Sequence, residues 1–313
     1  MEQLVLEEKK TKSSKIWNVI RWIPLGTMIL AAVVLLGMML AGGMTRISGW
    51  YLLQLIPPVL GIVSLIAVVI YAIVRRRRSK PIIVTGIASL VSLLPLILWF
   101  SPFAYPASLE KMSPSATIRL PADGPIRVVW GGDSLKTNYH AISPDQRWAY
   151  DLLIEPYFSG TPNLEDYGCY GVPVVAPING TVVSAHDGEP DEVPGVVSNN
   201  FTAPTGNHVM ILMDTGTYLV IAHLKNGSVA VKTGDVIEEG QMIGECGNSG
   251  NTSEPHIHIH HQRQDPTVYE LNFAEGLPLY FRDHDGPPMP VGGVRMEGET
   301  IIPLGDIVQH IGK

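Results

Sequence analysis

The stretch EPHIHIHHQ, from Glu254 to Gln262, contains four histidines in nine residues. Three of them, His256, His258 and His260, stand at alternate positions with isoleucine between them. If the stretch is a β-strand, the three imidazoles share one face and the isoleucines point to the opposite, apolar side. Side chains two positions apart then lie roughly 7 Å from each other, so one imidazole can bind a metal ion while another reaches the water bound to it. A solvated strand face is the alternative interpretation.

Two further residues offer metal donors upstream, in the stretch NYHAISPDQRWAYDLLI. A catalytic zinc site takes three protein ligands and keeps one position for water. His140 and Asp151 are candidates for the other ligands. Asp151 lies in an apolar, strand-like run, where an unpaired carboxylate is costly. A ligand role explains its position, and an ion pair or a cap is the alternative. Asp145, in SPDQ, is typical of a turn.

Three long apolar runs fill the first third of the 313-residue chain, which is 46% hydrophobic. They predict a membrane anchor over residues 1–105, with transmembrane helices at about 22–44, 50–74 and 81–101. Each run reaches the roughly 20 residues that cross a bilayer as helix, and none carries a charge inside it. The first run is longer than the apolar core of a signal peptide, and no small-residue cleavage site with a polar start follows it.

Basic residues predict the orientation of these helices. Between the first two runs the only basic residue is Arg46, whereas several precede the first run or separate the second from the third. These are Lys9, Lys10, Lys12, Lys15, Arg21 and the stretch RRRRSK from Arg75 to Lys80. By the positive-inside rule, the N-terminus and RRRR are cytoplasmic and everything after the third run is outside. We therefore expect a multi-pass protein of the cell membrane with an extracytoplasmic domain.

Charge divides the chain at the same place. Residues 1–105 carry 11 Lys and Arg against 3 Asp and Glu, a net charge of +8, and the remainder carries 11 against 26, a net charge of −15. So acidic a domain is not held electrostatically on nucleic acid or on an anionic wall polymer. The expected partner that localises the protein is the lipid bilayer.

Beyond the anchor, the sequence predicts one mainly antiparallel β domain. Residues 106–117 are rich in Pro and Ser and predict a linker. Over residues 118–264, short β-branched runs such as IRVVW, VPVVAP and TYLVIAHL are separated by Gly, Pro, Asn and Asp. Short runs bounded by turn residues are typical of antiparallel sheet. Residues 265–313 are rich in Pro and Gly and predict an irregular C-terminal extension.

The two cysteines, Cys169 and Cys246, both lie in the acidic part of the chain. An even count outside the cell permits a disulfide. Spacing alone does not show that the Cα atoms come within bridging distance. The sequence leaves open a disulfide, two free thiols and a metal-binding role.

Four ordered blocks between about Gly131 and Gln262 resemble the LytM/lysostaphin-type zinc metallopeptidases, β-rich endopeptidases that cut peptidoglycan cross-bridges and stems. NYH with AYDLLI resembles the block that carries the first His and Asp ligands of the family. GVPVVAPINGTVV resembles its strand–turn–strand block, and GNHVMI with YLVIAHL resembles the next two motifs. VKTGDVIEEGQMIGECGNSGNTSEPHIHI resembles the run that leads to the closing H-x-H. Four blocks in order are a specific signal, whereas a lone H-x-H is a weak one.

The resemblance implies a barrel-sandwich, duplicated hybrid motif fold and a set of site residues. The three Zn²⁺ ligands of the family fall on His140, Asp151 and His258, and its two other active-site histidines fall on His223 and His256. The family usually places the Asp four residues after the first His, whereas here it is the eleventh. The implied function is a membrane-anchored zinc metalloendopeptidase that hydrolyses amide bonds of peptidoglycan peptides. In this function zinc activates the attacking water, and His223 or His256 takes the proton of that water and passes it to the leaving amine.

The six other histidines are assigned lesser roles. His260 and His261 lie beyond the matched pair and are expected to support the site or to lie on the surface. Four more have no supporting motif and are expected to be structural or exposed: His186, His208, His284 and His310.

The main alternative is a non-catalytic cell-wall-binding or amidase-activating module on the same fold. Loss of a ligand or of an active-site histidine would favour it, and the sequence retains all five residues. A biotinyl- or lipoyl-type carrier is suggested by VKTGDVIEEGQMIG. Such a carrier needs a modifiable Lys, commonly in D-K-A or M-K-M, and neither triplet occurs in the chain.

Overall fold

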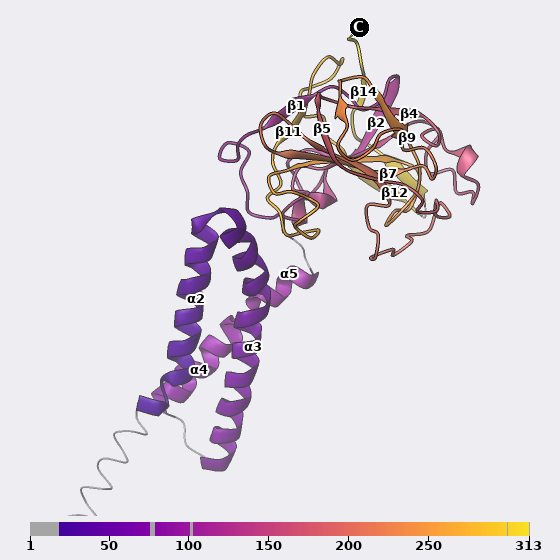
Figure 1. Ribbon diagram of the computed structural model, residues 1–313. Helices are drawn as coiled ribbons and strands as arrows, with labels where there is room; N and C mark the ends of the chain where they lie inside the picture. Colours follow the sequence, from indigo (N-terminus) through magenta and orange to yellow (C-terminus); the bar gives the residue numbers. More distant parts are fainter. Residues whose placement is uncertain (1–18, 76–78, 101–102, 299, 313) are drawn as a thin grey trace, which may run out of the picture. The chain divides into compact units, whose positions relative to one another are not determined.

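Two compact units make up the chain in the computed structural model, which describes residues 19–75, 79–100, 103–298 and 300–312 (Figure 1). The first unit is Met1–Pro102 and the second is Phe103–Lys313. The first is helical and the second is mainly β. Basic residues on which the predicted orientation depends lie outside the described residues, namely Lys9, Lys10, Lys12, Lys15 and residues 76–78.

The helical unit is as apolar as a membrane anchor requires. Its elements are α2 (Ile23–Ala41), α3 (Gly43–Arg75), α4 (Lys80–Val91), the 3-10 turn η1 (Leu94–Leu96) and α5 (Ile97–Phe100). Ile23–Ala41, Gly43–Val74 and Lys80–Phe100 are each long and apolar enough to cross a membrane. Many of their large apolar side chains are exposed, which is typical of helices whose solvent is lipid. The prediction of three apolar helices is confirmed.

The boundary between the first two helices differs from the prediction. Gly42 ends α2 with φ +77° and Gly43 begins α3 with φ +58°, a left-handed conformation that glycine adopts without steric penalty. Arg46 therefore lies in the first turn of α3 rather than in a loop. Its Nε donates to the carbonyl of Met39 at 3.0 Å, which satisfies one of the last carbonyls of α2. The predicted third helix is interrupted near Pro95, which lacks a backbone N–H.

The β unit is built on an eight-stranded sheet in which every neighbouring pair is antiparallel. The strand order is β14-β2-β3-β10-β7-β6-β5-β8. The strands are β2 (Pro125–Trp130), β3 (Tyr150–Leu153), β5 (Gly180–His186), β6 (Asn207–Leu212), β7 (Tyr218–Leu224), β8 (Val236–Ile237), β10 (Ile257–Gln262) and β14 (Ile307–Gln309). The predicted mainly antiparallel β domain is confirmed, and β10, which carries the histidine run, is an interior strand between β3 and β7.

Three two-stranded sheets accompany the large one among the described residues. They pair β1 (Ala116–Ile118) with β11 (Leu279–Phe281), β4 (Pro173–Val175) with β9 (Met242–Glu245), and β12 (Val294–Glu297) with β13 (Thr300–Pro303). The end of the predicted linker therefore belongs to a strand. The segment from residue 265 onward, expected to be irregular, contributes β11, β12, β13 and β14.

Both faces of β10 are covered. Ile257 and Ile259 are 1% and 0% exposed and pack in the main core with residues such as Leu152 and Ile221. Because side chains alternate along a strand, His258 and His260 point to the opposite face. That face is buried as well, since every residue of β10 is buried. The histidine run is therefore not a solvated strand face.

Cys169 and Cys246 form a disulfide with their Cα atoms 5.7 Å apart. Cys169 follows the short turn η3 (Leu164–Asp166), and Cys246 directly follows β9. Both residues are buried, and the bridge spans 77 residues of sequence. It ties the segment before β4 to the start of the loop that leads to β10.

Candidate active site

Strand pairing brings two of the predicted ligands together. In the register of β10 on β3, His258 is the partner of Asp151. Directly opposed residues on neighbouring strands project to the same face. His258 Nδ1 consequently lies 2.8 Å from Asp151 Oδ1, and both residues are 5% exposed.

The third predicted ligand comes from a short turn. His140 lies in η2 (Tyr139–Ile142), and its Nε2 is 2.9 Å from Asp151 Oδ2. Asn138 begins this turn: its side-chain oxygen accepts from the backbone N–H of His140, and its Nδ2 donates to the carbonyls of Gly132 and Ala149. Asn138 is fully buried, so this one side chain fixes the turn that carries His140.

The charge of the Asp151 carboxylate is held by these neighbours. Burial would raise the pKa of Asp151, but electrostatic interaction of its carboxylate with the imidazoles of His140 and His256, and a hydrogen bond from His140, lower it well below its usual range. Asp151 is therefore an anion at neutral pH. A buried anion in contact with two imidazoles is a strong attractor for a cation.

A β-bulge directs His223 into the same place. The pairs Asn207↔Leu224 and Val209↔Ile221 enclose one residue on β6 but two on β7, and the register shifts between them. His223 is one of the two β7 residues in this bulge, and it has φ +63°, a conformation few non-glycine residues adopt. Its Nδ1 lies 2.8 Å from the carbonyl of Ser249, and its ring centre lies 5.7 Å from that of His258.

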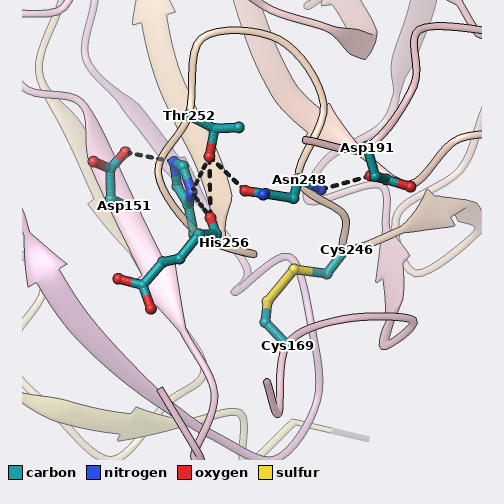
Figure 2. Close-up of a disulfide and its surroundings, with 8 residues drawn as sticks. Asp151, Cys169, Asp191, Cys246, Asn248, Thr252 and His256 are labelled. Carbon is teal, nitrogen blue, oxygen red and sulfur yellow. Dashed lines mark hydrogen bonds and ion pairs between the residues drawn. A yellow bond between two sulfur atoms is a disulfide. The ribbon is translucent and has the colours of Figure 1, made fainter. Parts of the chain in front are cut away.

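His256 is placed by the loop that follows the disulfide. Its Nδ1 lies 2.8 Å from the carbonyl of Glu254 and 3.4 Å from Thr252 Oγ1, and its Nε2 lies 3.6 Å from Asp151 Oδ1. Figure 2 shows the support of this ring: Thr252 also donates to Asn248 Oδ1 at 2.8 Å, and Asn248 N–H donates to Asp191 at 2.7 Å. The loop between Cys246 and His256 is thus held by the Thr252–Asn248 hydrogen bond within it and by the bond from Asn248 to Asp191 outside it.

The backbone carbonyls determine where His223 and His256 carry their protons. A carbonyl oxygen only accepts, so the Nδ1 of each ring must carry hydrogen and donate to it. In the neutral ring, Nε2 is then free of hydrogen. Burial, with repulsion between a protonated His223 and the neighbouring rings of His256 and His258, lowers the pKa of His223 well below its usual range, so His223 is neutral at pH 7. A neutral ring with a bare Nε2 can accept a proton.

Five side chains form two overlapping groups with metal-binding donors. His140, Asp151 and His258 form one group, and His223, His256 and His258 form the other. Within each group the donor atoms lie within 4.8 Å of one another, and all five residues are buried. Two imidazoles and one carboxylate are a donor set that suits a catalytic zinc ion, so the first group fits the implied metal.

A cavity of about 540 Å³ opens over these side chains. Its walls include apolar residues from four segments: Phe158, Val197, Leu271, and Val294 with Ile301 of the β12–β13 hairpin. Among the described residues that line it there is no Lys or Arg, while Asp151 and Glu254 contribute carboxylates. The described lining therefore offers acidic side chains and no fixed cationic side chain to a ligand.

Three residues of the site were missed by the sequence analysis. The ring of Tyr139 lies 4.0 Å from that of His140, and partial burial of its hydroxyl, with the nearby charge of Asp151, raises the pKa of Tyr139. The carboxylate of Glu254 accepts from the N–H of Phe158 at 2.9 Å, and burial raises the pKa of Glu254 to about 7. Ser249 acts through its carbonyl, which no side-chain pattern encodes. Tyr139 was detectable in principle, because it adjoins His140.

The remaining histidines divide into buried and peripheral ones. His260 and His261 are 2% and 1% exposed, so neither lies on the surface. His260 bonds to His258, whereas His261 bonds to Thr217 and to the carbonyl of Pro278 on the other side of β10. His186 stacks on His208 with ring centres 5.5 Å apart, and neither lines the cavity.

Asp145 lies in a turn, as its sequence context indicates, but its side chain is only 1% exposed. Oδ2 accepts from the backbone N–H of Asn272 at 2.7 Å, while Oδ1 is buried without a hydrogen-bond partner. Burial raises the pKa of Asp145 to about 6, against the opposing effects of the Asn272 bond and the charge of His140. The residue ties the turn after His140 to the segment that contributes Leu271 to the cavity.

Asp145 is expected to make the free energy of unfolding depend on pH. The folded state holds the proton up to about pH 6 and the unfolded state only to about pH 4, so this contribution is full below pH 4 and is lost as pH rises to 6. It amounts to about 3 kcal/mol. Asp145→Asn should remove it, which denaturant unfolding at pH 4 to 6.5 would show. The exposed Asp214→Asn is the control, and parallel curves for wild type and Asp145→Asn would contradict the assignment.

Comparison with known families agrees with this geometry. Residues 165–269 match the peptidase family M23. The β unit, here the M23 domain, resembles that family over these residues. The matched residues include His223, His256 and His258, but His140 and Asp151 precede the match. The structure is what brings these two residues to the other three.

Two curated relatives of the M23 domain are peptidoglycan DD-endopeptidases of Vibrio cholerae serotype O1. ShyA is 27% identical over 129 residues, which is 41% of this chain and 28% of ShyA. ShyC is 30% identical over 112 residues, 34% of this chain and 24% of ShyC. The chain thus spans about a quarter of the length of these relatives. Among solved structures, the catalytic domain of lysostaphin from Staphylococcus simulans is 20% identical, with a TM-score of 0.30, over 48% of this chain and 86% of that domain.

Proposed function

We propose that the M23 domain is a zinc metalloendopeptidase that hydrolyses amide bonds in peptidoglycan peptides. The observation that carries the proposal is the convergence of His140, Asp151 and His258 beside His223 and His256 in one cavity. The names of the two Vibrio relatives support peptidoglycan as the substrate class. A non-catalytic module would require none of the five side chains to be buried around a common point.

His140, Asp151 and His258 would hold the zinc ion through His140 Nε2, a carboxylate oxygen and His258 Nδ1. Zinc bound there would supply Lewis-acid activation of water and of the scissile carbonyl. The protein contributes the anionic charge of Asp151 and a buried setting in which that charge acts strongly.

His223 and His256 would move the protons of the reaction. Each presents a bare Nε2 toward the site because a backbone carbonyl holds the hydrogen on its Nδ1. One ring can take the proton of the attacking water and return it to the leaving amine. The protonated ring can also donate to the oxyanion that develops on the scissile carbonyl. Their ring centres lie 4.7 Å apart, so a single substrate amide can meet both.

Metal removal tests this proposal on the full chain in detergent. Treatment with a chelator is expected to stop the release of peptide fragments from purified peptidoglycan, and one equivalent of zinc should restore it. Mass determination should show the addition of one water for each bond cleaved. Digestion that persists without metal, or a protein that binds no zinc, would contradict the proposal.

We further propose that the three apolar helices anchor the protein in the cell membrane with the M23 domain outside. Their length and composition, the predicted orientation and the buried Cys169–Cys246 disulfide support this location. Disulfides persist in oxidising compartments and are rare in the cytoplasm. Both cysteines of the chain are in this bridge, so its state can be measured without ambiguity.

The location predicts that the protein in intact cells contains no free thiol. A thiol-reactive mass tag added to denatured extracts should give no shift before reduction and a shift of two tags afterwards. The Cys246→Ser variant, with one cysteine left, is the control for labelling and should take one tag without reduction. Two tags on the unreduced wild type would place the domain in a reducing compartment.

A further inference from the structure

A line of three side chains runs along the cavity-facing side of β10 and ends on a backbone carbonyl. His258 Nε2 lies 3.0 Å from His260 Nδ1, and His260 Nε2 lies 3.0 Å from Gln262 Oε1. Gln262 Nε2 then donates to the carbonyl of Gln264 at 2.7 Å. His258, His260 and Gln262 are 5%, 2% and 3% exposed, so water does not offer them alternative partners.

The contact of Gln262 with the Gln264 carbonyl fixes which atom donates and which accepts in every hydrogen bond of this line. The carbonyl oxygen of Gln264 can only accept, so the amide nitrogen of Gln262 must face it and the amide oxygen must face His260. His260 Nε2 therefore carries hydrogen, which leaves its Nδ1 as an acceptor. His258 Nε2 then donates to that atom, and His258 Nδ1 is bare in the neutral ring. The reverse direction would set the oxygen of Gln262 against the oxygen of Gln264.

The bare His258 Nδ1 is the atom that lies 2.8 Å from Asp151 Oδ1. Two acceptors at that distance repel each other unless a positive charge lies between them or beside them. The proposed zinc ion would supply that charge. The line along β10 thus prepares the tautomer of His258 that a cation requires.

We propose that His260 and Gln262 are positioning residues, which fix His258 in the tautomer whose Nδ1 binds zinc. This inference rests on the proposed metal site and adds two residues to its support. Partners on the far nitrogen of a ligating imidazole set its orientation and basicity, and their loss typically weakens metal binding about 10- to 100-fold.

Zinc affinity of the full chain, measured by competition with a coloured chelator, tests the inference. His260→Leu removes the acceptor for His258 Nε2–H and should weaken zinc binding about 10- to 100-fold. His260→Asn keeps an acceptor oxygen where Nδ1 stood and should bind within about threefold of wild type. Gln262→Leu leaves His260 in place but removes the acceptor that holds hydrogen on His260 Nε2. We therefore expect a loss of zinc affinity between those of the two His260 variants. The absorption spectrum of the cobalt-substituted protein should shift in the same order.

His261→Leu is the matched control, because His261 is an equally buried histidine of β10 that loses two hydrogen bonds outside this line. It should lower the melting temperature and leave zinc affinity unchanged. Equal affinity in wild type and His260→Leu, or equal weakening in His260→Asn and His260→Leu, would overturn the inference and leave the proposed function standing. A wild type that binds no zinc would defeat the proposed function itself.

Discussion

Replacing His258 with alanine is expected to abolish zinc binding and to reduce peptidoglycan hydrolysis at least about a thousand-fold. His258 belongs to both groups of metal-binding donors, and its Nδ1 lies 2.8 Å from the Asp151 carboxylate. Its loss removes a proposed ligand, and the activation supplied by the metal is worth several kcal/mol of barrier. Zinc content by atomic absorption and fragment release by mass spectrometry measure the two effects.

The control for this variant is His186→Ala. His186 is also a β-strand histidine beside a carboxylate, but its side chain is 47% exposed and it does not line the cavity. It should retain zinc and activity. The His258 variant leaves the buried Asp151 without one of its neighbours, so the variant could fold less stably. Its fold is therefore checked by comparing its melting temperature with that of wild type, both without metal. A folded His258→Ala protein that still digests peptidoglycan would remove His258 from the site.

His223→Asn is expected to separate proton transfer from metal binding. Asparagine tolerates the left-handed backbone that His223 adopts with φ +63°, and its amide can still donate to the carbonyl of Ser249. It has no counterpart of Nε2 that can accept a proton at neutral pH. We therefore expect turnover to fall about 10²- to 10⁴-fold while zinc affinity stays near that of wild type.

Two outcomes would contradict this role. Turnover at the wild-type rate would show that His256 alone exchanges the proton, and loss of zinc would make His223 a ligand of the second donor group. His208→Asn is a suitable comparison, because His208 is the single β6 residue opposite the bulge that contains His223 but lies outside the cavity lining.

The apolar helices and the antiparallel sheet follow from local features of the sequence. Uncharged runs of bilayer length predicted the three helices, and the alternation of His with Ile predicted the two faces of β10. Helix ends were less predictable, because Gly42 and Gly43 join α2 to α3 without the loop that Arg46 suggested. Two strands beyond residue 265, β11 and β14, were missed because their pairing partners β1 and β2 are distant in sequence.

The candidate site shows the same division. The resemblance selected His140, Asp151 and His258, and the structure brings them together, yet their roles remain predictions. What sequence could not supply is the backbone: the carbonyls of Ser249, Glu254 and Gln264 set the tautomers of the site histidines, and a carbonyl belongs to every residue type. For this reason the sequence left open whether His260 supports the site or lies on the surface, and its contact with His258 on β10 shows that it is next to the site.

The pairing of β3 with β10 also sets the order in which a site can appear during synthesis. Asp151 and His258 are 107 residues apart, and the strands that carry them meet only when the intervening chain has closed into the sheet. Contacts of such long range form late, because the entropy of closing the loop must be lost before the contact stabilises anything. The first half of the domain, with His140 and Asp151, leaves the ribosome before His258. The proposed zinc site is therefore incomplete in a nascent chain until β10 has docked, which delays the proposed hydrolytic activity.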